Sequence, residues 1–336
     1  MAIDVSTAQD VLIGVKEQTT FGTAMISSTA FELIKCDLPT IVPDVKMIKD
    51  KHSKASRYGD TSDVIVHEKG ALPVFSLPNT LIRKKDLAQF LYAFFQSVTE
   101  GLVGTGYSKA FTWPTSSQPD FTNAEGFFMT VAQSNPGTTD DYVVADCICK
   151  GLNFSIASGG ENNILKMSAD LIGRGSVAAT ESLSGTWTLA AESLFYLEDI
   201  TAVTFNHSSA ITPVVRKLDV KLTQDVVGIG QDSGQYQTYK IDNQAGKVTG
   251  SLFWEAPTAD LMGYWRAGTV GEWNITWGTA DTDGYLGMTF YGLLDSVATA
   301  VDDGLMIDFS LDLLGNSASS KVPATIVLAD AQSKGW

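Results

Sequence analysis

The chain has 336 residues, enough for about two domains, and its 44% of apolar and 18% of charged residues exclude a wholly disordered polymer. Its 38 acidic and 23 basic residues leave a formal charge of −15. Proteins that bind nucleic acid usually carry a net positive charge, so this composition argues against such binding, although many soluble proteins are also acidic. Cys36, Cys147 and Cys149 are too few for a disulfide framework, and with three scattered histidines they give no metal-ligand spacing, so we expect neither metal nor cofactor.

The first half of the chain reads as early strands followed by one helix. An early strand is expected at Phe31–Leu38, and a strongly basic loop, Pro43–Tyr58, follows it. The apolar stretch Leu72–Leu77 predicts another strand. Apolar groups then recur at i, i+3 and i+4 in Asp86–Leu91, which predicts a helix. The apolar run near Leu87–Phe95 is too short to span a bilayer, and the first residues lack the pattern of a secretory signal, so we expect no membrane association.

The first half is expected to end in a β-hairpin. The stretch Glu100–Asn123, rich in Gly, Ser, Thr and Pro, predicts a surface loop before it. The hairpin strands are Lys150–Ala157 and Leu165–Gly173, because apolar residues alternate in both and Gly159-Gly160 can supply the turn. The polar stretch Arg174–Ala191 predicts a linker.

The second half repeats this order of elements. Val215–Leu222 predicts an early strand, and the following loop, Asp225–Tyr236, is expected to be flexible and nearly uncharged. A strand at Val248–Trp254 precedes a helix at Asp260–Trp265. A terminal hairpin is then expected from two strands, Tyr291–Ala298 and Ile307–Gly315.

The correspondence between the halves predicts an internal duplication. Gly292 lies 141 residues after Gly151, Gly315 lies 142 after Gly173, and Asp260 lies 174 after Asp86. The first copy therefore carries about 33 extra residues between its helix and its hairpin. We expect one domain over residues 1–176, a linker at 177–191 and a second domain over 192–336.

The duplicated unit and the segment Thr20-Phe21-Gly22-Thr23-Ala24 together resemble the major tail tube proteins of long-tailed bacteriophages. The resemblance implies a mainly β fold of two tandem tail-tube-like domains, each a β-sandwich or half-barrel with one flanking α-helix. Tube domains form rings of about sixfold symmetry whose strands join into one inner barrel, and the rings stack. Two domains in one chain imply a pseudo-hexameric ring of three chains.

The resemblance also implies a function without catalysis. The chain would be a structural virion protein of the tail, assembled in the host cytoplasm, and the tube would be the conduit for genome delivery. Its partners would be further copies of itself, the terminator, tape measure and distal tail proteins, and DNA that passes through the lumen without specific binding. The basic loop occupies the place of the stacking loop in this family, which gives a hypothetical inter-ring contact at Lys46, Lys49, Lys51, Lys54 and Arg57. A solvated loop and direct DNA binding are the alternatives for these five residues.

The acidic composition is consistent with a lumen that repels phosphate. Strand parity does not say which face would be the lumen, so six carboxylates stay candidates: Asp37, Asp170, Asp219, Glu255, Asp308 and Asp312.

Other functions stay open. The chain has no nucleophile elbow, phosphate-binding loop or dinucleotide fingerprint, so we do not expect an enzyme. Another virion ring protein or a capsid decoration protein is one alternative. A carbohydrate-binding β-sandwich is another, since tryptophans cluster in the second copy at Trp254, Trp265, Trp273 and Trp277, although packing in the core or at a subunit interface explains them better.

Overall fold

The structure is a computed structural model, in which the protein is mainly β with two α-helices among the described residues. Pairing in the main sheet is antiparallel in this part of the chain, except between β11 (Trp187–Thr188) and β2 (Phe31–Leu33), which are parallel. The described residues are 12–18, 21–22, 31–37, 46–49, 66–69, 74–82, 84–103, 106–113, 128–134, 142–178, 187–188, 194–206, 210–211, 214–232, 235–253, 259–280, 282–301, 305–315 and 319–330.

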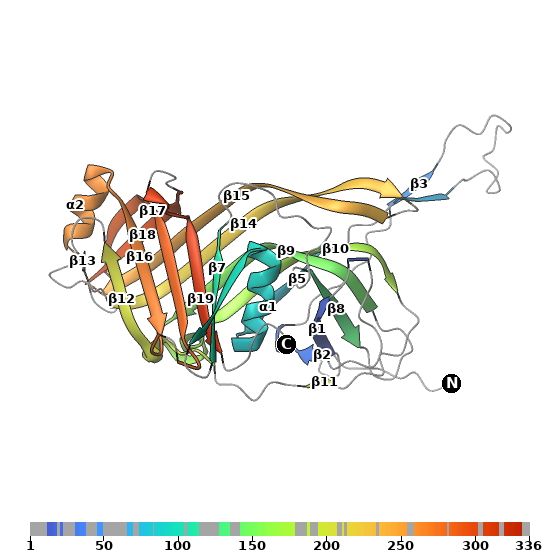
Figure 1. Ribbon diagram of the computed structural model, residues 1–336. Helices are drawn as coiled ribbons and strands as arrows, with labels where there is room; N and C mark the ends of the chain where they lie inside the picture. Colours follow the sequence, from blue (N-terminus) through green and yellow to red (C-terminus); the bar gives the residue numbers. More distant parts are fainter. Residues whose placement is uncertain are drawn as a thin grey trace.

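Figure 1 shows an elongated molecule with the first half of the chain on one side and the second half on the other. The first half contains β1 (Leu12–Gln18), β2, β3 (Lys46–Lys49), β4 (Val66–Lys69), β5 (Val74–Leu81), α1 (Lys84–Phe95), β6 (Val98–Val103), β7 (Gly106–Thr112), β8 (Phe128–Ser134), β9 (Tyr142–Ala157), a 3₁₀ turn (Gly160–Asn163), β10 (Lys166–Ala178) and β11. The second half contains a 3₁₀ turn (Leu197–Asp199), β12 (Ile200–Asn206), β13 (Ala210–Ile211), β14 (Val215–Asp232), β15 (Gln235–Phe253), α2 (Ala259–Ala267), β16 (Val270–Trp277), β17 (Leu286–Val301), β18 (Leu305–Leu313) and β19 (Ala324–Asp330).

The strands of the two halves pair in the same order. In the first half the order is β5, β10, β9, β8 and β1. In the second half it is β15, β18, β17, β16 and β12. A helix follows the first strand in each order, as α1 follows β5 and α2 follows β15.

One continuous sheet crosses both halves, and we call it the spanning sheet. Its strands are neighbours in the order β5, β10, β9, β14, β15, β18 and β17, because β14 pairs with β9 from the other half. Residues 35–37 extend it by one short segment, since the Leu81 amide donates to the Lys35 carbonyl oxygen at 2.9 Å and the Asp37 amide to that of Pro78 at 3.0 Å. A second link between the halves is the pairing of β19 with β7.

Alternation along these strands separates an apolar face from a polar one. On β9, Leu152, Phe154 and Ile156 are at most 2% exposed, while Asn153 between them is exposed. This confirms the hairpin expected at 150–173, and β17 with β18 confirms its counterpart at 291–315. The apolar face forms the main core with α1, in which every residue from Leu87 to Phe95 is buried.

The two helices end for the same local reason and differ in their surroundings. Gln96 follows α1 with a φ of 52° and Gly268 follows α2 with a φ of 61°, the left-handed conformation that commonly terminates helices. Both helices were expected from the spacing of their apolar residues, and both are present. α1 lies between the two halves (Figure 1) and contacts β7, β8, β9 and β19, whereas α2 lies at the outer end of the second half and packs on β17.

Two expected loops are strands instead. Much of Glu100–Asn123 belongs to the hairpin of β6 and β7, while residues 114–123 lie outside the described residues. β7 obtains its second partner from β19, more than 200 residues later, so local composition could not reveal it. The stretch Asp225–Tyr236 was expected to be flexible, but β14 and β15 stay paired as far as Asp232 and Gln235.

The expected linker at 177–191 has strands at both of its described parts. β10 continues through Ala178, and Trp187–Thr188 forms β11 on β2. The residues between them lie outside the described part of the chain.

Candidate functional site

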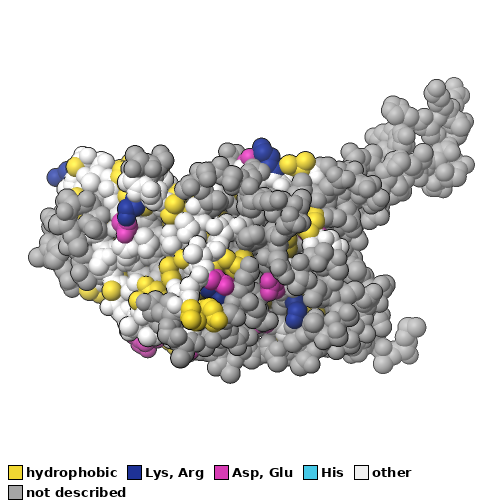
Figure 2. Space-filling model, in the orientation of Figure 1, with side chains coloured by type: hydrophobic (Ala, Val, Ile, Leu, Met, Phe, Trp, Pro, Cys, Tyr) yellow, Lys and Arg dark blue, Asp and Glu magenta, His cyan; other side chains and the backbone are white. Residues whose placement is uncertain are grey.

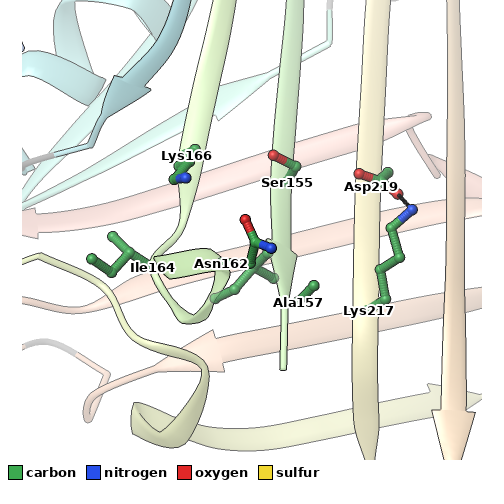
Figure 3. Close-up of a pocket in the computed structure, with 8 residues that line it drawn as sticks. Ser155, Ala157, Asn162, Ile164, Lys166, Lys217 and Asp219 are labelled. Carbon is green, nitrogen blue, oxygen red and sulfur yellow. Dashed lines mark ion pairs between the residues drawn. The ribbon is translucent and has the colours of Figure 1, made fainter. Parts of the chain in front are cut away.

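The polar face of the spanning sheet carries an ordered array of polar side chains on neighbouring strands. Directly paired residues share a face of a sheet, so cross-strand pairs trace rows across it. Figure 3 shows the beginning of one row, in which Lys166, Ser155 and Asp219 lie side by side on three neighbouring strands. The full row crosses six strands: Lys166, Ser155, Asp219, Thr249, Ser310 and Ser296.

Five of the six candidate lumen carboxylates lie on this polar face, and the sixth, Glu255, lies outside the described residues. Asp170 pairs with Ser76 of β5 and Asp308 with Ser251 of β15, both through serine hydroxyl donors. The others on the face are Asp37, Asp219 and Asp312, placed by their pairing with residues 78–81, Thr249 and Lys247.

The face is not purely acidic, because lysines are interleaved with the aspartates. Lys217 lies 2.8 Å from Asp219, and Lys247 lies 3.0 Å from Asp295 and 3.3 Å from Asp312. The hydrogen bond that Lys247 donates to Asp295, together with the nearby Asp312 carboxylate, raises the pKa of Lys247, so this lysine is held in its charged form. Sequence reasoning selected the carboxylates and missed these lysines, although charged residues occupy every second position in Lys217–Lys221, with Asp219 between the two lysines.

Figure 2 shows the same mixing on the side of the molecule in view, where Lys or Arg atoms lie beside Asp or Glu atoms without a broad area of one sign among the coloured residues. Such partly exposed ion pairs each contribute about 0.2–1 kcal/mol to stability. Their larger effect is on the surface field, because each aspartate cancels the attraction of its lysine for anions.

A shallow pocket of about 230 Å³ opens on this face at the end of β9. Figure 3 shows Lys217 and Asp219 on one side, joined by their ion pair, and Asn162 and Ile164 of the turn after β9 on the other. The lining contains one carboxylate, Asp219, which already pairs with Lys217, so it offers no set of metal ligands.

The five residues proposed for the inter-ring contact are only partly placed. Lys46 and Lys49 lie on β3, which pairs with β4 so that Lys46 is opposite Lys69 and Lys49 is opposite Val66. Lys51, Lys54 and Arg57 lie outside the described residues. The base of this loop is therefore a two-stranded ribbon, and it projects toward the same end of the molecule as the far end of β15 (Figure 1).

The extended hairpin of β14 and β15 is fixed to the first half by a small second core. Its Val226, Tyr239 and Ile241 pack with Phe128, Ile148 and Ile172 of the first half. The Tyr239 hydroxyl donates to the Asp146 carbonyl oxygen at 3.0 Å. The Asp146 carboxylate in turn accepts hydrogen bonds from the Gln18 side chain and from the Gly22 amide.

The tryptophans do not form a sugar-binding platform in the described residues. Trp273 is fully buried and stacks on Phe309 with ring centroids 4.6 Å apart. Trp277 is 1% exposed and donates from its indole nitrogen to the Tyr196 carbonyl oxygen. Trp265 is 38% exposed, and Trp254 lies outside the described residues.

The thiols are placed for packing rather than chemistry. Burial raises the pKa of Cys36 to about 12 and raises those of Cys147 and Cys149 strongly, so all three stay protonated near neutral pH. Within the described residues, no group of three His, Cys, Asp or Glu side chains could hold a metal ion. Neither described helix is long and apolar enough to cross a membrane.

Comparison with known proteins gives no family assignment. No protein-family model matches the chain. No curated protein matches it either. The geometry of the spanning sheet is therefore the basis for the function proposed below.

Proposed function

We propose that this chain is a non-catalytic structural subunit of a hollow tube, of the kind built by bacteriophage major tail proteins. In this proposal the polar face of the spanning sheet lines the lumen, and the tube is the conduit for genome delivery. The face suits that role because it is an even array of small polar residues and ion pairs over seven strands.

The tandem duplication is part of the proposal, and the repeated order of strand pairing supports it. In both halves a helix follows the first strand of this pairing order. Each half also contributes a hairpin to the spanning sheet, β9–β10 in the first and β17–β18 in the second. With domains at 1–176 and 192–336, three chains would supply six similar units to one ring.

The observation that carries the proposal is the open sheet edge at both ends of the spanning sheet. Within the described residues, β17 pairs only with β18 beyond Leu293, and residues 35–37 pair only with β5. Unpaired edges of this kind favour aggregation unless another strand covers them. A ring of chains would cover both of these edges.

Electron microscopy of the purified full chain tests the proposal. Stacked rings or long hollow tubes are expected as the protein concentration rises, and rings alone should show threefold symmetry with six similar lobes. The partners proposed for such a tube are further copies of the chain, the terminator, tape measure and distal tail proteins, and DNA in transit. A protein that stays a monodisperse monomer at high concentration would exclude the tube.

A further inference from the structure

The pocket at the end of β9 carries one positive charge in excess. Two lysines, Lys166 and Lys217, line it together with a single carboxylate, that of Asp219. Lys217 lies 2.8 Å from Asp219, so these two charges cancel. Lys166 makes no ion pair with any described residue. Glu198 accepts a hydrogen bond from the Asn163 side chain at 3.5 Å and does not line the pocket, so it does not neutralise Lys166 there.

Two uncharged polar groups accompany Lys166. Ser155 is directly opposite Lys166 on β9, so the two side chains share the polar face. Asn162, in the turn between β9 and β10, lines the same hollow from the other side (Figure 3). In the described part of the chain, neither the Ser155 hydroxyl nor the Asn162 side-chain amide forms a hydrogen bond. Ammonium, hydroxyl and amide groups all donate hydrogen bonds, so three unused donors line one pocket.

The backbone that carries these donors is fixed before any ligand binds. Lys166 is paired on both sides, with Ser155 of β9 and with Leu81 of β5. The Asn162 backbone amide donates to the Gly159 carbonyl oxygen at 3.3 Å, which closes the turn. Gly159 has a φ of 108°, a conformation that favours glycine and lets the chain leave β9 sharply. Donors held in this way lose little backbone freedom on binding, which favours affinity for a small ligand.

The size and the donors of the pocket select a small anion. Its volume of about 230 Å³ is below the roughly 300–1,000 Å³ of pockets that enclose drug-sized molecules. A cation is disfavoured by the excess charge of Lys166. An oxyanion of the phosphate type has acceptor oxygens in several directions and can accept from an ammonium, a hydroxyl and an amide at once.

The corresponding place in the second half does not repeat this arrangement. Asp308 lies 142 residues after Lys166, the spacing that also relates the last glycines of the two hairpins. Its partner on β17 is Ala298, where Lys166 has a serine. The Asp308 carboxylate already accepts the hydroxyl of Ser251. A carboxylate and a methyl group thus replace an ammonium and a hydroxyl, so the cationic pocket belongs to the first half.

We propose that this pocket binds one phosphate-type oxyanion, which Lys166 holds together with the Ser155 hydroxyl and the Asn162 side-chain amide. Lys166 supplies the charge, the other two groups supply further hydrogen bonds, and Lys217 stays with Asp219. The site goes beyond the proposed tube function and does not depend on it. Free inorganic phosphate and a backbone phosphate of nucleic acid share this chemistry, and the experiment below distinguishes these two sources.

Titration of the full chain with inorganic phosphate tests the site. Line broadening in phosphorus NMR reports binding, and the melting temperature should rise because the ligand binds the native state. Potassium chloride at the same ionic strength is the reference throughout. Lys166→Gln should raise the apparent Kd for phosphate about tenfold or more, because it removes a charged hydrogen-bond donor. Ser155→Ala removes a neutral donor and should raise the apparent Kd about threefold.

Lys221→Gln is the matched control. Lys221 lies on the same face of β14, is exposed, and has no ion pair within the described residues. It does not line the pocket, so its loss removes the same charge without removing a donor from the site. This variant should bind phosphate as the wild type does. Circular dichroism checks that all three variants are folded, and Asn162→Ala, in an exposed turn residue, gives a further test of the pocket.

Two results would overturn the site: an equal loss of phosphate binding in Lys166→Gln and Lys221→Gln, or a wild type that responds to phosphate no more than to chloride. A labelled DNA duplex at low salt identifies the source. If Lys166→Gln also weakens duplex binding and phosphate competes with the duplex, the anion is a backbone phosphate. If only phosphate binding changes, the anion is free phosphate. Absence of rings or tubes would count against the tube function and would leave the phosphate site standing.

Discussion

Removing three aspartates from the polar face should convert it into a surface that binds polyanions. Asp219→Asn, Asp295→Asn and Asp312→Asn together take away the carboxylates that pair with Lys217 and Lys247. Two freed lysines that contact phosphates should steepen the slope of log K against log salt by about 1.8, since each contact contributes about 0.9 on duplex DNA. Affinity for DNA should then fall about tenfold more than in the wild type between 50 and 200 mM salt.

Fluorescence anisotropy of a labelled duplex, titrated at several salt concentrations, measures this slope. The three ion pairs are partly exposed, so their loss should cost no more than about 1–3 kcal/mol of stability, and the variant can be checked for folding by circular dichroism. The matched control changes the same net charge outside the spanning sheet, with Glu198→Gln, Asp199→Asn and Asp283→Asn, all exposed. An equal gain in DNA affinity for both triple variants would refute the reasoning, because net charge alone would then explain it.

Three further predictions concern the core. Trp273→Ala should lower the free energy of unfolding by about 3–5 kcal/mol in urea titrations, because Trp273 is fully buried against Phe309, and the half-exposed Trp265→Ala should cost far less. Gly292→Ala should lower the free energy of unfolding by about 1–3 kcal/mol, because the new Cβ would lie 2.2 Å from the Asp312 carbonyl oxygen. The control Gly101→Ala, whose Cβ would have nothing within 4 Å, should leave stability nearly unchanged. Equal melting temperatures for the two variants would contradict this reasoning. The three thiols should react with a disulfide reagent at pH 8 only after unfolding. Because the folded pKa values of the thiols are raised, their contribution to stability should be complete below about pH 9 and decline as pH rises toward 12. Melting temperatures measured across this pH range should therefore fall less for a Cys36→Ser variant than for the wild type.

Local alternation and helical spacing were enough to predict the elements whose partners are close in sequence. In the hairpin of β9 and β10, apolar and polar residues alternate, so all the apolar side chains lie on one face of the strands and are buried together. The turn between the strands contains Gly159 with a φ of 108°. The helices at 84–95 and 259–267 follow from apolar residues one turn apart. These signals are carried by neighbouring residues, so a single chain reveals them.

Elements whose stability depends on distant partners were predicted poorly. Glycines and polar residues near 228–234 resemble a loop, yet Val226 and Tyr239 are covered by the first half and keep the strands paired around them. β7 was hidden among turn-forming residues, although Phe111 and Trp113 alternate with polar neighbours and pack against α1. The polar face posed the same difficulty, because only the register across β9, β14 and β15 brings its lysines and aspartates into rows.

The hairpin of β14 and β15 has a consequence for the order in which the protein can fold. Phe128, Ile148 and Ile172 belong to the first half, but Val226, Tyr239 and Ile241 of the second half complete the cluster around them. The first half therefore cannot finish this cluster as it leaves the ribosome, and it must keep apolar surface exposed until Ile241, which lies 69 residues after Ile172, has been made. Folding should thus depend on the completed chain, and a truncated first half should be prone to aggregate.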